Sequence, residues 1–266
     1  MKKAIVLLSG GLDSATTLYL ARKQGYKCFC LSFDYGQRHK KEIESAKKIA
    51  QVTNCPYKIL KIKFPWKGSA LLDRDIIIPK RANGQTGKRA NAIPSTYVPA
   101  RNIIFLSFAL SFAEATGAQA IFIGAHAQDY SGYPDCRPEF YRAFIKVADK
   151  GTKAGVEGKS LKIITPLIRK SKAQIINLGK KLGVPFELTW SCYRGGRVPC
   201  GKCDSCYYRA KGFKEAGLKD PLLFRDVFGA LATNRGESAK SRHKNWRVRQ
   251  SFWRNFGGNR KGVPTR

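Results

Sequence analysis

The segment from Ser9 to Ser14 reads Ser-Gly-Gly-Leu-Asp-Ser and directly follows the apolar run Ala4–Leu8. That run predicts a buried strand, so two glycines and two hydroxyl side chains come at the point where a helix begins. Glycine lets backbone N–H groups approach an anion closely, and the first amides and the dipole of a helix favour negative charge. The segment therefore predicts a phosphate site. Its spacing fits neither Walker A nor the dinucleotide motif, and the alternative is a plain strand-to-helix turn.

Four cysteines near the other end of the chain have the spacing C-x7-C-x2-C-x2-C: Cys192, Cys200, Cys203 and Cys206. Glycines between them allow tight turns that bring four thiolates to one centre. An all-sulfur tetrahedral site suits Zn²⁺, and a closed shell of four ligands makes the metal structural. An iron–sulfur cluster and free or redox-active thiols are the alternatives. Of the scattered cysteines, Cys28, Cys30 and Cys55 are predicted to be small buried apolar residues.

Short apolar runs alternate with helical patterns, which predicts an α/β fold with a parallel sheet that positions both motifs. The long apolar helix over 102–116 is expected to be buried against the sheet. Residues 71–91 break any period and predict an excursion from the sheet. The expected strands are Ala4–Leu8, Lys27–Phe33, Tyr57–Ile62, Ala120–Gly124 and Leu161–Thr165, and the expected helices are Ser14–Gln24, Glu42–Gln51, Asn102–Thr116 and Ser171–Leu182.

Length and composition favour a globular protein with one full core. The chain has 266 residues, of which 43% are hydrophobic, and no stretch reaches the ~18 apolar residues of a spanning helix. We therefore expect a soluble, cytoplasmic protein without membrane contact. In that compartment, clustered cysteines argue for metal or catalysis before disulfides.

The formal net charge of +32 is unusual for an enzyme of small molecules and is not confined to one segment. Such a field attracts polyanions, RNA and ATP included. Residues 226–266 interleave arginines with aromatic residues, among them Trp246, Trp253 and Phe256. That pattern suits phosphate contact with base stacking, whereas basic runs are commonly just disordered, solvated extensions; a cover for a dimer surface is a third option.

Together, the motifs resemble a known family. Ser9–Ser14 is similar to the pyrophosphate loop of ATP pyrophosphatases, and the cysteine region, with the segments between, resembles 7-cyano-7-deazaguanine synthases over about residues 3–221. The segments that carry the resemblance are Asp34–His39, Val98–Asn102, Asp129–Arg137, Thr165–Leu167, Ser191–Tyr193 and Pro199–Cys206. Ala100 stands where the family more often has glycine.

The resemblance implies a fold and a domain organisation. It implies a Rossmann-like parallel sheet of the ATP-pyrophosphatase type with a small C-terminal zinc-binding region. We expect an ATP-binding catalytic domain at 1–185, a four-cysteine region at 186–225 and the basic, aromatic-containing tail at 226–266. A homodimer is also expected.

The implied activity is a ligase of queuosine and archaeosine biosynthesis. 7-Carboxy-7-deazaguanine, ammonia and ATP would give 7-cyano-7-deazaguanine through an acyl-adenylate and an amide. The chemistry agrees with the loop, because a carboxylate must first be esterified to AMP, which ammonia can then displace from the acyl carbon. The loop would grip the departing pyrophosphate, with Mg²⁺ bridging its oxygens and Asp13 as an outer ligand.

The resemblance and the residue types together suggest site residues. The catalytic set is Asp13, Ser14, Asp135 and Arg137, in which Asp135 would accept the N–H donors of the deazaguanine edge; Asp129 and Glu139 are rivals for that role. Arg137 and Arg101 would hold a carboxylate or phosphates. The residues expected around ATP are Leu8, Ser9, Gly10, Gly11, Leu12, Asp13, Ser14, Ala15, Thr16, Thr17, Leu18 and Arg101.

Two other functions stay open at this point. A tRNA thiolase or lysidine-type ligase with the same loop would explain the basic surface, but a thiolase needs a cysteine to carry persulfide, and the clustered cysteines are predicted to hold metal. The second open function is that of a module that transfers the deazaguanine to a macromolecule. Product analysis separates free nitrile from modified tRNA and from a conjugate.

Overall fold

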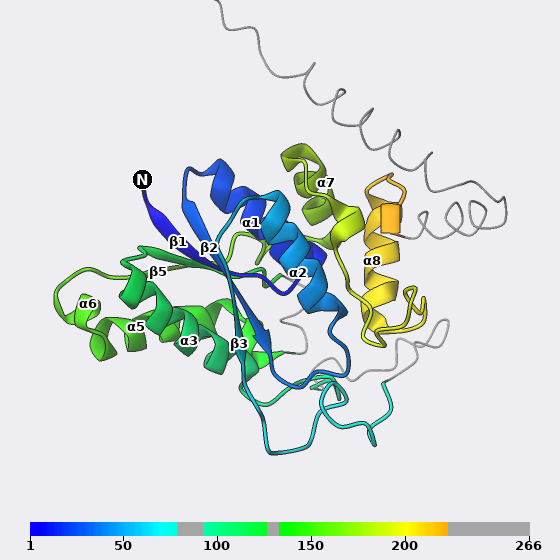
Figure 1. The fold of residues 1–266 in the computed structure, drawn as a ribbon, viewed down its shortest axis with the longest axis horizontal. Helices are drawn as coiled ribbons and strands as arrows, with labels where there is room; N and C mark the ends of the chain where they lie inside the picture. Colours follow the sequence, from blue (N-terminus) through cyan, green and yellow to red (C-terminus); the bar gives the residue numbers. More distant parts are fainter. Residues whose placement is uncertain (79–92, 127–132, 223–266) are drawn as a thin grey trace, which may run out of the picture. The chain divides into compact units, whose positions relative to one another are not determined.

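The computed structural model describes residues 1–78, 93–126 and 133–222. Five strands form one parallel sheet in the order β3-β2-β1-β4-β5 (Figure 1). The strands are β1 (Lys3–Leu7), β2 (Lys27–Asp34), β3 (Tyr57–Lys61), β4 (Ala120–Phe122) and β5 (Lys162–Ile164). The α/β fold class and all five expected strands are confirmed.

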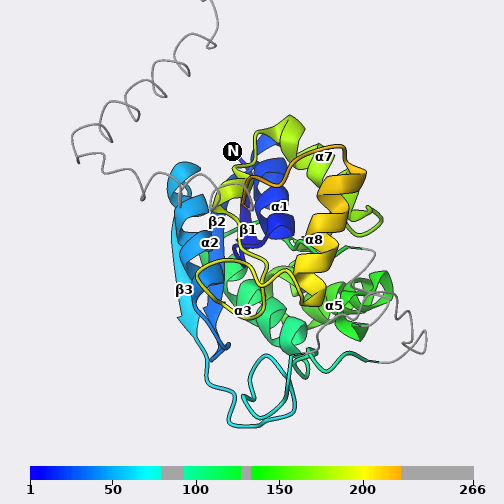
Figure 2. The same ribbon diagram turned by 90° about the vertical axis from the view of Figure 1, so that its right-hand side faces the viewer.

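Helices cover both faces of the sheet. The longer ones are α1 (Leu12–Lys23), α2 (Lys41–Val52), α3 (Arg101–Thr116), α5 (Pro138–Gly151), α7 (Lys172–Leu182) and α8 (Asp204–Glu215); the short ones are η1 (Pro134–Cys136), α6 (Lys153–Val156) and η2 (Phe186–Leu188). Figure 2 shows α8 beside α7, with the cysteine segment leading into it. No helix in the described ranges is long and apolar enough to cross a membrane.

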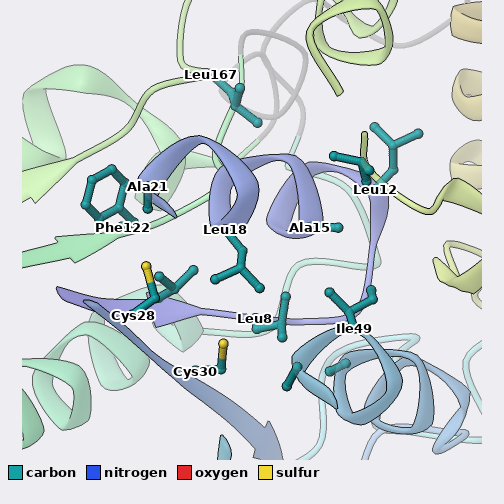
Figure 3. Packing of buried hydrophobic residues seen from close by; sticks show 14 of the residues in the cluster. Leu8, Leu12, Ala15, Leu18, Ala21, Cys28, Cys30, Ile49, Phe122 and Leu167 are labelled. Atoms are coloured by element: carbon teal, nitrogen blue, oxygen red, sulfur yellow. The ribbon is translucent and has the colours of Figure 1, made fainter. Parts of the chain in front are cut away.

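The alternation of side chains along β1 divides the core in two. Val6 and Leu8 pack with α1, α2 and α7, while Ile5 and Leu7 pack with α3 and α5 on the opposite face. Figure 3 shows Leu18 of α1 directed into the layer between its helix and the segment after β1 that carries Leu8. Because β1 is central and packs against the core on both faces, the position of the first residue of the loop that follows it is fixed.

One expectation for the fold was wrong in part. The helix α3 buries only one side against the sheet, through Leu106, Ala109 and Ala113. Ile103 and Phe108 on its other side are 43% and 42% exposed. An all-round apolar sequence does not indicate how many of the faces of a helix are covered.

The carboxyl ends of β1 and β4 mark the place where ligands bind in open parallel sheets. The chain runs outward from β1 to β2 and β3, and then returns to place β4 on the other side of β1. Sheets of this kind bind ligands at that reversal, outside the carboxyl ends of the strands. The segment Ser9–Ser14 follows β1 at this edge.

Candidate functional site

The loop Ser9–Ser14 has the geometry of an anion cradle. Gly10 has φ +87°, and a Cβ on it would lie 2.0 Å from the carbonyl oxygen of Glu42. The Ser14 hydroxyl donates to the Gly11 carbonyl at 3.0 Å and lies 3.0 Å from Ser9 Oγ. No side chain caps α1 at Gly11, so the first amides of the helix stay available to an anion.

Asp13 in the first turn of α1 meets a lysine and a histidine. Lys172 Nζ lies 2.8 Å from both carboxylate oxygens, and 2.8 Å from Nε2 of the buried His126. That nitrogen is in turn 3.6 Å from Asp13 Oδ2. Burial opposes ionisation of Asp13, but Lys172 and then His126 outweigh it and lower its pKa. The carboxylate is therefore held in its charged form beside the loop.

Sequence reasoning missed both Lys172 and His126. Lys172 is the first residue of α7, whose start is fixed by a capping box between Ser171 and Gln174. A lysine in the first turn of a helix opposes the helix dipole, and that unfavourable placement was the available signal. His126 follows β4 at the same sheet edge, and nothing local in the sequence marks it.

A cavity of about 270 Å³ opens beside the loop. The carboxyl ends of the central strands, the starts of α1, α2 and α3, and the cysteine segment line it. Of the residues expected to hold ATP, the lining includes Leu8, Ser9, Gly11, Asp13, Ser14 and Arg101. The side chains of Leu12, Ala15, Thr16, Thr17 and Leu18 are buried instead, and Figure 3 shows the three apolar ones within the core.

Arg101 begins α3 and faces an aromatic hydroxyl in the cavity. Burial disfavours its charge, but Tyr35, Cys136 and Asp135 raise its pKa above the usual value. Burial also raises the pKa of Tyr35, a shift that Arg101 opposes in part by a hydrogen bond. Both groups line the cavity, so a lasting positive charge is available to an anionic ligand.

Asp135 lies behind this wall of the cavity. Its Oδ2 accepts the backbone N–H of Asn102 at 3.1 Å, and its carbonyl oxygen lies 3.3 Å from Asn102 Nδ2. The same Nδ2 lies 3.2 Å from Sγ of Cys136. Asn102 and Cys136 line the cavity, whereas the Asp135 carboxylate is buried and occupied in fixing the start of α3.

The other predicted substrate residues are not among those that line this cavity. Arg137 is exposed at the start of α5. Glu139 is exposed and pairs with Arg142 at 3.2 Å. Asp129 lies outside the described residues. The carboxylates that do line the cavity are Asp13 and Glu42, and sequence reasoning did not single out Glu42.

The four clustered cysteines converge as their spacing predicts. One sulfur from each of Cys192, Cys200, Cys203 and Cys206 lies within 4.8 Å of the others. The Cys192 sulfur receives hydrogen bonds from the Cys203 and Cys206 thiols and from two backbone amides, which hold its pKa far below the usual range. Backbone donors aimed at thiolate sulfur fit a bound metal ion, so the chemistry of this cluster is compatible with a metal site.

The cysteine segment also touches the phosphate loop. The backbone N–H of Trp190 donates to the Gly10 carbonyl at 2.9 Å, and its indole N–H donates to the Cys192 carbonyl at 2.9 Å. Tyr193, next to Cys192, and Ser205, next to Cys206, line the cavity. The cysteine segment therefore forms one wall of the cavity that the loop opens into.

Comparison with known proteins agrees with this arrangement. The family model described as Queuosine biosynthesis protein QueC matches residues 3–217. The 7-cyano-7-deazaguanine synthase 2 of Desulfitobacterium hafniense (strain Y51) is 55% identical over 224 residues, which are 84% of this chain and 93% of that protein. The 7-cyano-7-deazaguanine synthases of Acetivibrio thermocellus (55%, 85% and 99%) and Trichodesmium erythraeum (51%, 83% and 100%) are also similar. The resemblance expected from the motifs is thus confirmed: the chain belongs to the queuosine biosynthesis protein QueC family.

Proposed function

We propose that this chain converts 7-carboxy-7-deazaguanine, ammonia and ATP into 7-cyano-7-deazaguanine. Its relatives of 50–55% identity carry the name of that synthase. The observation that carries the proposal is one cavity lined by an anion cradle and by the cation Arg101, with the cation Lys172 paired to Asp13, which is itself a lining residue. Such a space suits two negatively charged reactants that must meet.

The first step is the activation of the substrate carboxylate. A carboxylate oxygen attacks the α-phosphorus of ATP, the bond to the β-phosphate breaks, and an acyl-adenylate and pyrophosphate result. The N–H groups at Gly11 and at the start of α1 donate hydrogen bonds to the leaving pyrophosphate and so stabilise its developing charge, and Lys172 neutralises part of that charge. The hydroxyls of Ser9 and Ser14 donate to phosphate oxygens.

Asp13 is the residue of the loop that would hold a Mg²⁺ ion bound together with ATP. Its carboxylate is kept ionised by Lys172 and His126, and oxygen ligands of this kind suit that ion. When bound, Mg²⁺ supplies further positive charge to the phosphates. Lys172, whose Nζ lies 2.8 Å from both Asp13 oxygens, would add positive charge beside the same phosphates.

Two further steps complete the nitrile. Ammonia attacks the acyl carbon, AMP leaves and a proton is lost, which gives the primary amide. The amide oxygen then attacks the α-phosphorus of a second ATP and pyrophosphate leaves, which gives an O-adenylated imidate; loss of AMP and of the two N–H protons then leaves the C≡N bond. Arg101 is placed to hold the substrate carboxylate or the α-phosphate in both rounds. Asp135 positions Arg101 by fixing the start of α3.

The four thiolates would hold Zn²⁺ as a structural ion. Four protein ligands leave no position for water, so the ion would order the wall formed by Trp190 and Tyr193 and would take no part in the reaction.

The test is incubation of the full chain with 7-carboxy-7-deazaguanine, ATP, Mg²⁺ and ammonium, followed by mass spectrometry and nucleotide analysis. The expected products are the free nitrile, AMP and pyrophosphate. Without ammonium, the enzyme should still exchange labelled pyrophosphate into ATP in the presence of the carboxylate. Formation of ADP, or recovery of the deazaguanine only on a macromolecule, would contradict the proposal.

A further inference from the structure

Glu42 is a cavity residue for which the reaction described above has no use. It is the second residue of α2 and lines the cavity with a partly buried side chain. Within the described ranges, no hydrogen bond or ion pair reaches its carboxylate, and Arg101 acts on it only through its field. A carboxylate in a cavity normally has a partner, so a donor group of a ligand is the missing partner.

The surroundings of Glu42 favour a planar ligand. Phe33 and Phe105 stack at 3.9 Å between ring centroids and line the same cavity, as do Tyr35, Trp190 and Tyr193. Aromatic walls bind the faces of a flat heterocycle, whereas a carboxylate binds adjacent N–H donors at its edge.

We propose that the Glu42 carboxylate binds the N1–H and the 2-amino group of the 7-deazaguanine ring and so selects this substrate. The inference rests on the proposed function. Two acceptor oxygens match two neighbouring donors, as a carboxylate meets the planar fork of arginine. Adenine presents an acceptor nitrogen beside its amino group, so the same carboxylate rejects the base of ATP.

The position of Glu42 relative to the loop gives the contact a second role. The Glu42 carbonyl oxygen packs so closely on Gly10 that a Cβ there would lie 2.0 Å away. The start of α2 is therefore fixed against the phosphate loop, and the carboxylate with it. A ring held at Glu42 is held at a constant distance from the bound phosphates, which places the 7-carboxyl group for attack.

The test compares the substrate with its analogue that lacks the 2-amino group. For the unaltered enzyme, kcat/KM measured by pyrophosphate release should be at least about 100-fold lower for the analogue, because a buried acceptor loses its donor. In Glu42→Gln, kcat/KM for the substrate should fall about 100-fold or more, and the preference for the 2-amino group should shrink to about 10-fold or less. KM for ATP should stay within about threefold.

Glu44→Gln is the matched control, since Glu44 lies in the same turn of α2 but is exposed; it should behave as the unaltered enzyme. Circular dichroism and a thermal melt check that both variants are folded. The proposal is overturned if Glu42→Gln keeps the full preference for the 2-amino group, or if it raises KM for ATP while the preference is unchanged. An unaltered enzyme that forms no nitrile from either compound would instead disprove the proposed function.

Discussion

The phosphate loop and the cysteine segment meet at one cavity but are held in place by different forces. The loop joins a central strand to α1, and both contribute side chains to the larger core, Leu8 and Leu18 among them. The cysteine segment packs in a small cluster, in which the thiols themselves are half of the fully buried members. We infer that the loop keeps its shape through the core and that the cysteine segment keeps its shape through the bound metal.

This difference predicts opposite responses to mutation. Apart from Leu12, the side chains of the loop lie outside the hydrophobic core, so changing them should affect turnover more than stability. Side chains of the cysteine segment are the core of their region, so changing them should affect stability first. Four experiments, in order of expected effect, test or refine the contrast.

Lys172→Met should lower kcat/KM for nitrile formation by about 1,000-fold, because a cation aimed at the developing phosphate charge is lost. The free energy of unfolding should fall by no more than about 2 kcal/mol, since the Lys172 stem packs on Gly212 and methionine retains that contact. Steady-state kinetics and urea unfolding measure the two. Lys180→Met on the exposed side of α7 is the control. Loss of stability without loss of turnover would reverse the assignment.

Cys203→Ser should release the metal and lower the free energy of unfolding by several kcal/mol, because Cys203 is fully buried and binding energy at such a site is folding energy. Elemental analysis should find one zinc per unaltered chain and less in the variant. Cys55→Ser, outside the cluster, should keep the zinc. Iron with labile sulfide, or active enzyme without metal, would show that the zinc assignment is wrong.

Glu42 lies beside the phosphate loop, where we expect the charge of its carboxylate to reduce the stability of the fold. Burial raises its pKa from 4.5 to about 7, although Arg101 opposes the shift. A carboxyl that binds its proton more tightly when folded stabilises the protein below pH 4.5, and that stability is lost as the pH rises through about 7. As the pH rises from 5 to 8, the free energy of unfolding of Glu42→Gln should therefore increase by about 1 to 2 kcal/mol relative to that of the unaltered protein. This value is reduced to allow for the water that the cavity admits. Urea unfolding at both pH values measures it, and a constant difference would contradict the buried charge.

Deletion of residues 226–266 should have the smallest effect on the reaction, less than about twofold on kcat/KM. The family match ends at residue 217, before the deletion begins. Binding to a short RNA should weaken, and the lost part should depend steeply on salt because arginines such as Arg247 and Arg249 release counterions. Filter binding at two salt concentrations tests this. A truncated enzyme that makes no nitrile would mean that the tail completes the site.

Both motifs could be predicted because they are local patterns in the sequence. Contacts between distant parts of the chain could not be predicted. The loop and the three close cysteines are defined by neighbours in the sequence, so spacing alone indicated their chemistry. Lys172 lies 159 residues from Asp13, and no local pattern connects them. Asp135 was predicted to accept the donors of the deazaguanine edge, but its buried carboxylate is directed toward Asn102, and that direction depends on how η1 packs against α3.

The hydrogen bond from Trp190 to the Gly10 carbonyl has a consequence for how such enzymes change over evolution. A cysteine segment exchanged as a unit would have to present a peptide N–H to the loop at this one point. A substitution to proline at position 190 removes that donor while leaving every thiol in place. Recombination between distant relatives should therefore succeed when the crossover lies after residue 206 and fail when it separates the loop from the segment that binds it.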